Sequence, residues 1–363
     1  MQLSHTRPVR AAVFDDPNLV SSAGLVPMLA LARSAGLGRL ADQHLSVPTD
    51  KGANAGLKVS SLVAGMVAGA DSIDDMSILR HGGMGKVFTG AYAPSTLGSF
   101  LRAFSFGHVR QLDAVASRSL GGLAAATPLV AGVDQYALVD VDDTIIEVHG
   151  YAKAGSGYGY SAVRGLNALL ATLTTKDTAP VIVAQRLRKG SCGSPRGAKR
   201  LVADALATVK KLRTDPGAKV LLRADSAFYG RGAIGAAVRA GAQVSVTVRL
   251  DKLIRATIAA IADDAWTTIQ YTDAIFDETT STWISRAEVA EVPFTAFAAG
   301  KKPTRCPGGS SSAGSPTSTP TPARRPCSTP GASTRSSPPA PWTPWPRTKP
   351  TAATRSSNKS TPT

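Results

Sequence analysis

The order of strand-like and helix-like segments between residues 136 and 250 restricts the fold more than any other feature of this sequence. Three β-rich runs come first, "YALVDVDDTIIEV", "RGLNALLATLTT" and "APVIVAQRLR". The second has helical propensity, but its place between two strand-like runs favours a strand. Next come an amphipathic helix, "GAKRLVADALATVKKLR", and a strand, "KVLLRAD". They are followed by a helix that stops at Gly241 and by a final strand. Three meandering strands followed by alternating helices and strands predict an α/β fold with a mixed sheet.

The segments on either side of this core differ from it. Residues 1–125 read as a helical domain, and "APSTLGSFLRAFSFG" is its clearest helix, with Ser95 or Thr96 as the expected cap. This domain is interpreted either as a small structural bundle or as a DNA-binding domain, because Arg102, His108 and Arg110 lie off the apolar stripe. Residues 126–260 form the predicted core. Residues 261–300, which contain "WTTIQYTDAIFD" and "TWISRAEVAEVPF", are predicted to form an incomplete β-rich insertion.

Residues 301–363 have a composition that cannot form a hydrophobic core. They contain 14 of the 24 prolines, no Asp or Glu, and no Leu, Ile, Val, Met, Phe or Tyr. Such a segment buries too little apolar surface to offset chain entropy, so it is expected to be disordered. Its ten Lys and Arg residues supply +10 of the net charge of +16. The basic character therefore belongs mainly to the tail, and charge alone is weak evidence for a nucleic-acid partner.

Neither a membrane span nor a disulfide framework is expected. No apolar run approaches the roughly 18–20 residues that a transmembrane helix needs. The N-terminus lacks the layout of a secretory signal. The three cysteines form no CxxC pair, and their number is odd. A cytoplasmic protein fits best.

Carboxylates are concentrated in the first strand-like run. Asp140 and Asp142 share one face of that strand, about 6.6 Å apart at Cα, whereas Asp143 and Glu147 face the other way. Asp225 ends a later strand, directly before a helix. Carboxylates gathered in an apolar strand repel one another, and a divalent cation relieves that repulsion. Asp142 as a turn cap and Asp225 as a helix cap are the structural alternatives.

The sequence resembles the DDE transposases of bacterial insertion sequences, specifically the group numbered 1380. The resemblance covers about residues 1–300 and rests on "LVDVDDTIIEVHGYAKAGSGYGYSAVRGLNALLATLTT", "APVIVAQRLRKGSCGSPRGAKRLVADAL" and "VLLRADSAFYGRGAI". It implies a ribonuclease H-like fold with one catalytic Asp on the first strand and another after the fourth. Asp142 is the first choice for the former, Asp140 is the near alternative, and Asp225 takes the second place.

The resemblance also implies a chemistry and a set of partners. Carboxylates would hold Mg²⁺, or Mn²⁺, for phosphodiester hydrolysis and strand transfer. The partners would be double-stranded DNA, as terminal inverted repeats and target, and further copies of the chain. A nucleoid-associated location follows. Phe228 and Tyr229 either stack on a base or belong to the core. The expected contacts with the DNA backbone, each with a solvated surface as the alternative, are Arg186, Arg188, Lys189, Arg196, Lys199 and Arg200.

A second resemblance is weaker. "DVDDT" is similar to the D-x-D-x-T motif of haloacid-dehalogenase-like phosphatases, in which Asp140 would be the nucleophile. That motif leads from the first strand of a parallel sheet towards a helix. Here it leads into more strand-like sequence, and no lysine-bearing motif follows. The phosphatase remains the alternative among enzymes.

The chain departs from the transposase pattern at its end. A DDE enzyme needs a third acid, a Glu well downstream, but no acid follows Glu291. The tail can also be read in a shifted frame, in which each new codon joins the last base of one tail codon to the first two bases of the next. In that frame "PCSTPGAST" permits Leu-Phe-Asp-Thr-Trp-Arg-Phe-His. In the same way, "RSSNKSTP" permits Ile-Ile-Glu-Gln-Val-His-Ala, which resembles the Glu-bearing segment of the family. We therefore predict a frameshift after about residue 300 and an inactive chain. The alternative to the frameshift is a genuine Pro/Ser/Thr-rich basic tail that binds DNA nonspecifically. The alternative to an enzyme is a non-catalytic fragment that only binds DNA or poisons the assembly of subunits.

Overall fold

A computed structural model describes residues 16–88, 90–149, 153–270, 276–279, 281–283 and 286–297. All of these residues belong to one compact unit, Met1–Ala323. The tail from residue 301, expected to be disordered, lies outside the described residues. Among the helices described, none is long and apolar enough to cross a membrane.

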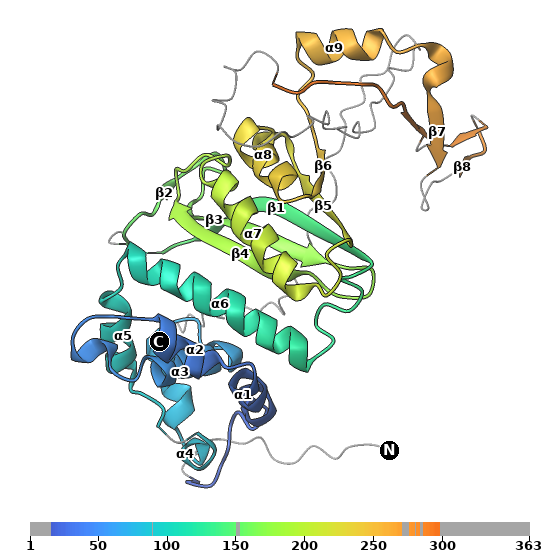
Figure 1. Cartoon of the computed structure of the whole chain (residues 1–363). Helices are drawn as coiled ribbons and strands as arrows, with labels where there is room; N and C mark the ends of the chain where they lie inside the picture. Colours follow the sequence, from blue (N-terminus) through green and yellow to red (C-terminus); the bar gives the residue numbers. More distant parts are fainter. Residues whose placement is uncertain are drawn as a thin grey trace, which may run out of the picture. The chain divides into compact units, whose positions relative to one another are not determined.

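The N-terminal part is helical, as expected (Figure 1). Apolar side chains from these helices gather in two clusters, and Leu97, Phe100 and Val115 are almost fully buried in the larger one. The elements are α1 Leu25–Ser34, α2 Leu37–His44, η1 Asp50–Gly52, α3 Ala55–Val67, η2 Asp74–Arg80, α4 Met84–Val87, α5 Pro94–Arg102 and α6 Phe106–Ala126.

The expected cap of α5 is wrong. The helix begins at Pro94, and Ala93 occupies the N-cap position without a side-chain hydrogen bond. Proline suits the first helical position, because its ring fixes φ and its missing N–H would have had no intrahelical partner. The serine that does cap a helix is Ser105, which begins α6 in a capping box with His108. His108 Nδ1 accepts the Ser105 backbone N–H at 2.9 Å, so this histidine has a structural role.

The central sheet is mixed, as the order of elements predicts. β1 pairs antiparallel with β3 and parallel with β5, β3 pairs antiparallel with β2 and β4, and β5 pairs parallel with β6. Apart from the two-residue β2, the strands lie in the order β4-β3-β1-β5-β6, which is the ribonuclease H-like arrangement. The strands are β1 Tyr136–Glu147, β2 Gly157–Tyr158, β3 Arg164–Thr174, β4 Val181–Lys189, β5 Lys219–Ala224 and β6 Gln243–Val246.

One face of the sheet is covered by helices. α7 (Ala198–Leu212) and α8 (Arg231–Arg239) share a core with the inward side chains of β1, β3 and β5. Figure 1 shows α7 lying across the sheet with α6 alongside. Leu201 and Leu169 are fully buried there. The helix stop expected at Gly241 is confirmed, since this residue adopts φ +78° directly after α8.

The opposite face of the sheet has no hydrophobic core among the described residues. Its partly buried leucines belong to none of the core clusters. Leu187 is 62% exposed and Ile146 is 50% exposed on this face. Both faces of a sheet with parallel central strands are normally covered, so this face lacks a partner within the described part of the chain. The leucines concerned are Leu138, Leu166, Leu170 and Leu221.

Short elements follow the core. The strand-like character of the last segments is confirmed where the structure describes them, because β7 and β10 pair antiparallel, as do β8 and β9. A helix after β6, α9, was not expected from the sequence. Phe297 returns to the core and stacks on Tyr229, with ring centroids 4.9 Å apart. The elements are η3 Ser226–Phe228, α9 Lys252–Ala259, η4 Asp263–Ala265, β7 Thr267–Gln270, β8 Phe276–Asp277, β9 Thr282–Trp283 and β10 Arg286–Val289.

Candidate active site

Asp142 and Asp225 lie side by side where the parallel pairing of β1 and β5 ends. The last pair in the register of β1 and β5 is Val141 with Ala224, and each Asp is the next residue along the chain. Asp225 follows the end of β5, whereas β1 continues past Asp142 to Glu147 beside β3. Both belong to the same face, because Leu138 pairs with Leu221 and Asp140 with Arg223 on that face. Neighbouring strands are about 4.8 Å apart. The two carboxylates therefore start from neighbouring backbone positions and point to one side.

The electrostatics of Asp142 reflect this neighbourhood. Its pKa is raised, first because surrounding protein displaces water and then because Asp225, Asp143 and Asp140 add negative charge. The Asp143 backbone N–H donates to Asp142 Oδ1 at 2.8 Å and offsets part of this effect. A carboxylate that is disfavoured in its charged form beside a second carboxylate is a site that a cation would stabilise.

Asp225 has a structural role in addition to its place at the site. It is the N-cap of η3, and its Oδ1 accepts the Ala227 backbone N–H at 3.0 Å. The capping role that the sequence left as an alternative is therefore real. The same bond fixes the direction of the carboxylate at the strand end. Of the two aromatic residues that follow, Phe228 is buried in the core and Tyr229 stacks on Phe297.

Asp140 is engaged by an arginine. Arg223 donates from Nε to Asp140 Oδ1 at 2.6 Å and from Nη2 to Oδ2 at 2.7 Å. This bidentate pair, chiefly through its hydrogen bonds, raises the pKa of Arg223. Both oxygens of Asp140 are occupied, whereas among the described residues Asp142 accepts a hydrogen bond on one oxygen only. The geometry therefore favours Asp142 over Asp140 as the partner of Asp225.

Asp143, on the helix-covered face, is part of a buried network with Arg188. Arg188 Nη2 donates to Asp143 Oδ2 at 3.0 Å, and its Nε donates to Asn167 Oδ1 at 2.9 Å. The same guanidinium donates to the carbonyls of Ser194 and Arg196, and its side chain is only 9% exposed. Arg188 thus ties the loop after β4 to the strand that carries Asp142.

Arg186 is also directed inward. Its Nη2 contacts Asp204 Oδ2 of α7, and its side chain is 15% exposed. Between these two arginines, Leu187 faces outward. The sequence favoured Arg186 and Arg188 as DNA contacts, but the structure commits both guanidiniums to carboxylates inside the protein.

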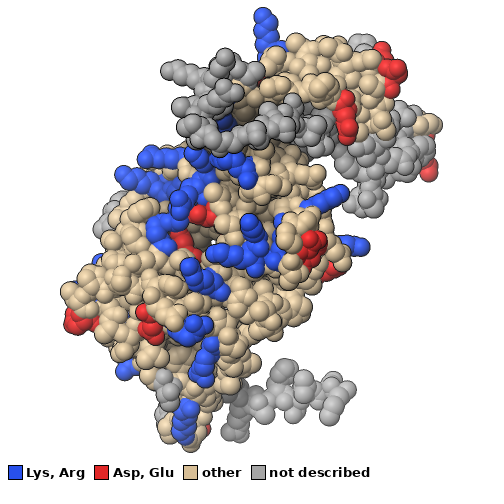
Figure 2. All heavy atoms as spheres, viewed as in Figure 1, with Lys and Arg blue, Asp and Glu red and all other residues tan. Residues whose placement is uncertain are grey.

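The four other basic residues singled out in the sequence are exposed. They lie at the end of β4, in the loop after it and in the first turn of α7. β4, β1 and β5 run in the same direction, so these residues lie at the same end of the sheet as Asp142 and Asp225. Figure 2, which views the helix-covered face of the sheet, shows Lys and Arg gathered around α7. The four residues are Lys189, Arg196, Lys199 and Arg200.

The donor set fits a hard divalent cation in kind, but it is incomplete. Carboxylate oxygens are the ligands that Mg²⁺ prefers, and it keeps several waters when few protein ligands are present. Within the described ranges, no group of three or more His, Cys, Asp or Glu residues could hold a metal. Two acids converge here, and a third is not found in the part of the chain that the structure describes.

Comparisons with known proteins identify the family. No curated protein matches the sequence. Among solved structures, a Mos1 transposase paired-end complex with left transposon end matches at 9% identity and a TM-score of 0.21. That match covers 57% of this chain and 72% of the other, and its TM-score is too low to support an inference. The family model described as transposase DDE domain, group 1, matches residues 1–305, so the chain belongs to this transposase family.

Proposed function

We propose that this chain derives from an insertion-sequence transposase of the group numbered 1380, in which Asp142 and Asp225 are two of the three catalytic acids. The observation that carries the proposal is their placement on one face of the sheet, at neighbouring positions where the parallel pairing of β1 and β5 ends. The family match supports the same reaction class, metal-dependent hydrolysis of a phosphodiester and strand transfer. Asp140, held by Arg223, is not the first catalytic acid in this proposal.

The two carboxylates would hold Mg²⁺ or Mn²⁺. Such an ion, when bound, polarises a phosphoryl oxygen and lowers the pKa of bound water. The residues of this chain contribute negative charge and position. The Asp143 N–H directs the Asp142 carboxylate, and the Ala227 N–H directs that of Asp225. Arg223 neutralises the third carboxylate of the strand pair, so the charge at this face is concentrated on Asp142 and Asp225.

The chain as given is proposed to be frameshifted after about residue 300 and inactive. Two properties support this proposal. No acid follows Glu291, so a third ligand from the C-terminal part is missing. The sheet face that carries Asp142 and Asp225 also lacks a hydrophobic cover within the described ranges, and residues 301–363 contain no branched aliphatic residue that could provide one. A downstream segment in the original frame would supply both the acid and apolar side chains.

Double-stranded DNA is the proposed partner. The exposed cations Lys189, Arg196, Lys199 and Arg200 lie at the catalytic end of the sheet, where they could hold phosphates. Assembly of two or more copies on the terminal repeats belongs to the same proposal.

A phosphatase function is less well supported. A phosphatase with Asp140 as nucleophile would need a carboxylate oxygen free for attack, but both accept hydrogen bonds from Arg223. A non-catalytic DNA-binding fragment is the function left to the chain if the frameshift is real.

The test is Mg²⁺-dependent cleavage of DNA that carries the ends of the encoding element. The chain as given is compared with a version in which one base is corrected between the codons of Phe297 and Thr304. We expect cleavage only by the corrected protein, and its loss on Asp142→Asn or Asp225→Asn but not on Asp215→Asn. Cleavage by the chain as given, or a corrected protein indifferent to Asp142→Asn, would overturn the proposal.

A further inference from the structure

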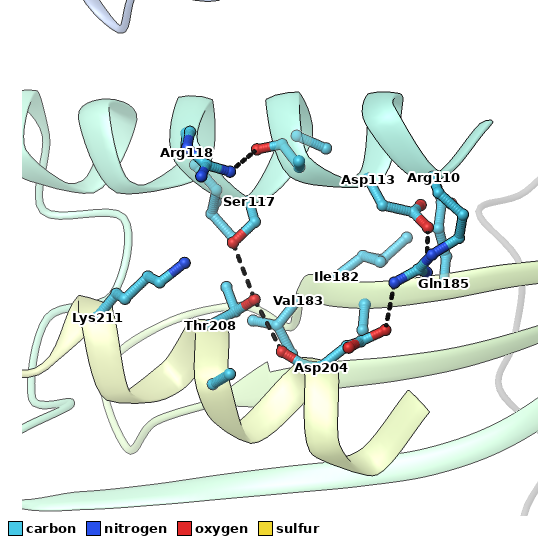
Figure 3. Close-up of a pocket in the computed structure, with 15 residues that line it drawn as sticks. Arg110, Asp113, Ser117, Arg118, Ile182, Val183, Gln185, Asp204, Thr208 and Lys211 are labelled. Atoms are coloured by element: carbon cyan, nitrogen blue, oxygen red, sulfur yellow. Dashed lines mark hydrogen bonds and ion pairs between the residues drawn. The ribbon is translucent and has the colours of Figure 1, made fainter. Parts of the chain in front are cut away.

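A cavity lies between α6 and α7 on the helix-covered side of the sheet, away from the carboxylate pair. Its volume is about 470 Å³. β4 forms its floor, and the two helices form its walls (Figure 3). Ala114, Ala116 and Ala207 leave the walls open because their side chains are small. In the middle, Ser117 Oγ and Thr208 Oγ1 are 3.0 Å apart and join the two helices.

One end of the cavity is closed by a charge network. Arg110 contacts Asp113 at 2.5 Å and Asp204 at 3.0 Å, and Asp204 also pairs with Arg186 and Arg200. Three guanidiniums thus face two carboxylates, so both carboxylates are already paired and the net charge of this end is not negative. It fixes the spacing of the two helices.

The other end carries cations that have no carboxylate partner. Arg118 donates only to the Ala114 carbonyl of its own helix, at 3.1 Å, and Lys211 forms no ion pair within the described ranges. Both side chains are exposed, and both line the cavity. Figure 3 shows them on opposite walls, Arg118 on α6 and Lys211 on α7.

We propose that this cavity binds a phosphate of the DNA backbone between Arg118 and Lys211. A phosphate is favoured because both side chains are positively charged donors, and the described acids that line the cavity, Asp113 and Asp204, lie at its other end. The DNA source is favoured by continuity, since Lys199 and Arg200 lie at the other end of the same helix. Lys199 and Lys211 are separated by about 18 Å along α7, which corresponds to about five base pairs.

This site differs in role from the carboxylate pair. The sheet separates the two, so the phosphate held here is not the one that reacts. The cavity would contribute affinity and orientation without reading base sequence. The assignment rests on the proposed DNA partner, and its test keeps the two claims apart.

The experiment measures binding of a labelled random-sequence duplex to the full chain over a range of salt concentrations. Arg118→Gln and Lys211→Gln are each expected to weaken binding and to reduce the slope of log affinity against log salt by about 1. Because both side chains would hold one phosphate, the double variant should lose little more than either single variant. Lys210→Gln is the matched control, since its residue is equally exposed but does not line the cavity.

A second pair of variants tests the cavity by adding charge. Ala207→Glu places a carboxylate in the wall and should weaken DNA binding more than Ala203→Glu, which changes an exposed position outside the lining. Wild-type protein that binds no duplex would overturn both the DNA partner and the cavity site. Binding in which Lys211→Gln and Arg118→Gln behave as Lys210→Gln does would overturn the cavity site alone. Inorganic phosphate that binds wild type but not the double variant, with an unchanged DNA slope, would also overturn it.

Discussion

The Asp204 side chain is predicted to contribute substantially to the free energy of unfolding, because its carboxylate joins α6, β4 and α7. It accepts from Arg110 on α6, from Arg186 on β4 and from Arg200 within α7. Asp204→Ala would leave Arg186, whose side chain is 15% exposed, without its charged partner. Arg186 Nε already lacks a hydrogen-bond partner among the described residues. The variant should therefore be destabilised.

The three contacts contribute unequally. A largely buried charge-assisted hydrogen bond such as that of Arg186 is worth about 1.5–3 kcal/mol. The Arg200 pair, whose guanidinium is 69% exposed, adds about 0.3–0.5 kcal/mol. Arg110 keeps Asp113 as a partner, so its loss is small. The expected total is about 2–3 kcal/mol, which lowers the thermal midpoint by about 4–12 °C at the 2–4 °C per kcal/mol typical of a large domain.

Asp113→Ala is the matched control. Burial is the main cause that raises the pKa of Asp113, so its charged form is not well accommodated, and Arg110 retains Asp204 when Asp113 is lost. Its expected cost is below about 1 kcal/mol. Thermal unfolding followed by circular dichroism measures both variants. Equal losses for the two variants, or a larger loss for Asp113→Ala, would refute the reasoning.

Three other predictions concern the site and the loop behind it. Asp142→Asn should raise the thermal midpoint at pH 7, because the pKa of Asp142 is raised in the folded state and its charged form therefore destabilises the fold at pH values above that pKa. The gain over wild type should shrink as the pH is lowered towards 3.8, and a gain that stays constant with pH would contradict this. Gly190→Ala should unfold the end of β4, since a Cβ at this position would lie 2.1 Å from the Gly165 carbonyl oxygen. Gly193→Ala is the control and should be neutral, because its Cβ would meet nothing within 4 Å. Similar urea midpoints for the two variants would contradict the close contact between Gly190 and Gly165. Arg188→Gln should speed tryptic cleavage after Arg196, because it frees the loop; an unchanged digestion rate would show that Arg188 does not hold it.

The order and type of the core elements were predictable because each carries a local signal. "RGLNALLATLTT" forms β3 in spite of its helical propensity, since pairing with β1 and β4 on both sides outweighs the preference of single residues. The gathering of Asp142 and Asp225 could be expected for the same reason. Asp225 follows a strand of the same sheet that carries Asp142, and the ends of adjacent strands are the usual place for a site on such a sheet.

Pairing between distant side chains was not predictable. Arg223 and Asp140 meet only because β1 and β5 are in a particular register, which no local pattern specifies. In "QRLRK" the alternation suggests arginines outside and Leu187 inside, but the structure has the reverse arrangement. Asp143 and Asp204 lie on the inner face and hold Arg188 and Arg186 there. The position of a carboxylate on another element decided the direction of these side chains.

The most direct test of the central claim, that Asp142 and Asp225 form one cation site, is Mn²⁺ binding to the chain as given. Electron paramagnetic resonance of the free ion measures it without any need for catalysis. We expect weak binding that is lost in both Asp142→Asn and Asp225→Asn and is retained in Asp140→Asn, because Arg223 already engages Asp140. Binding that survives loss of Asp142 or Asp225, or that depends on Asp140 alone, would contradict the account.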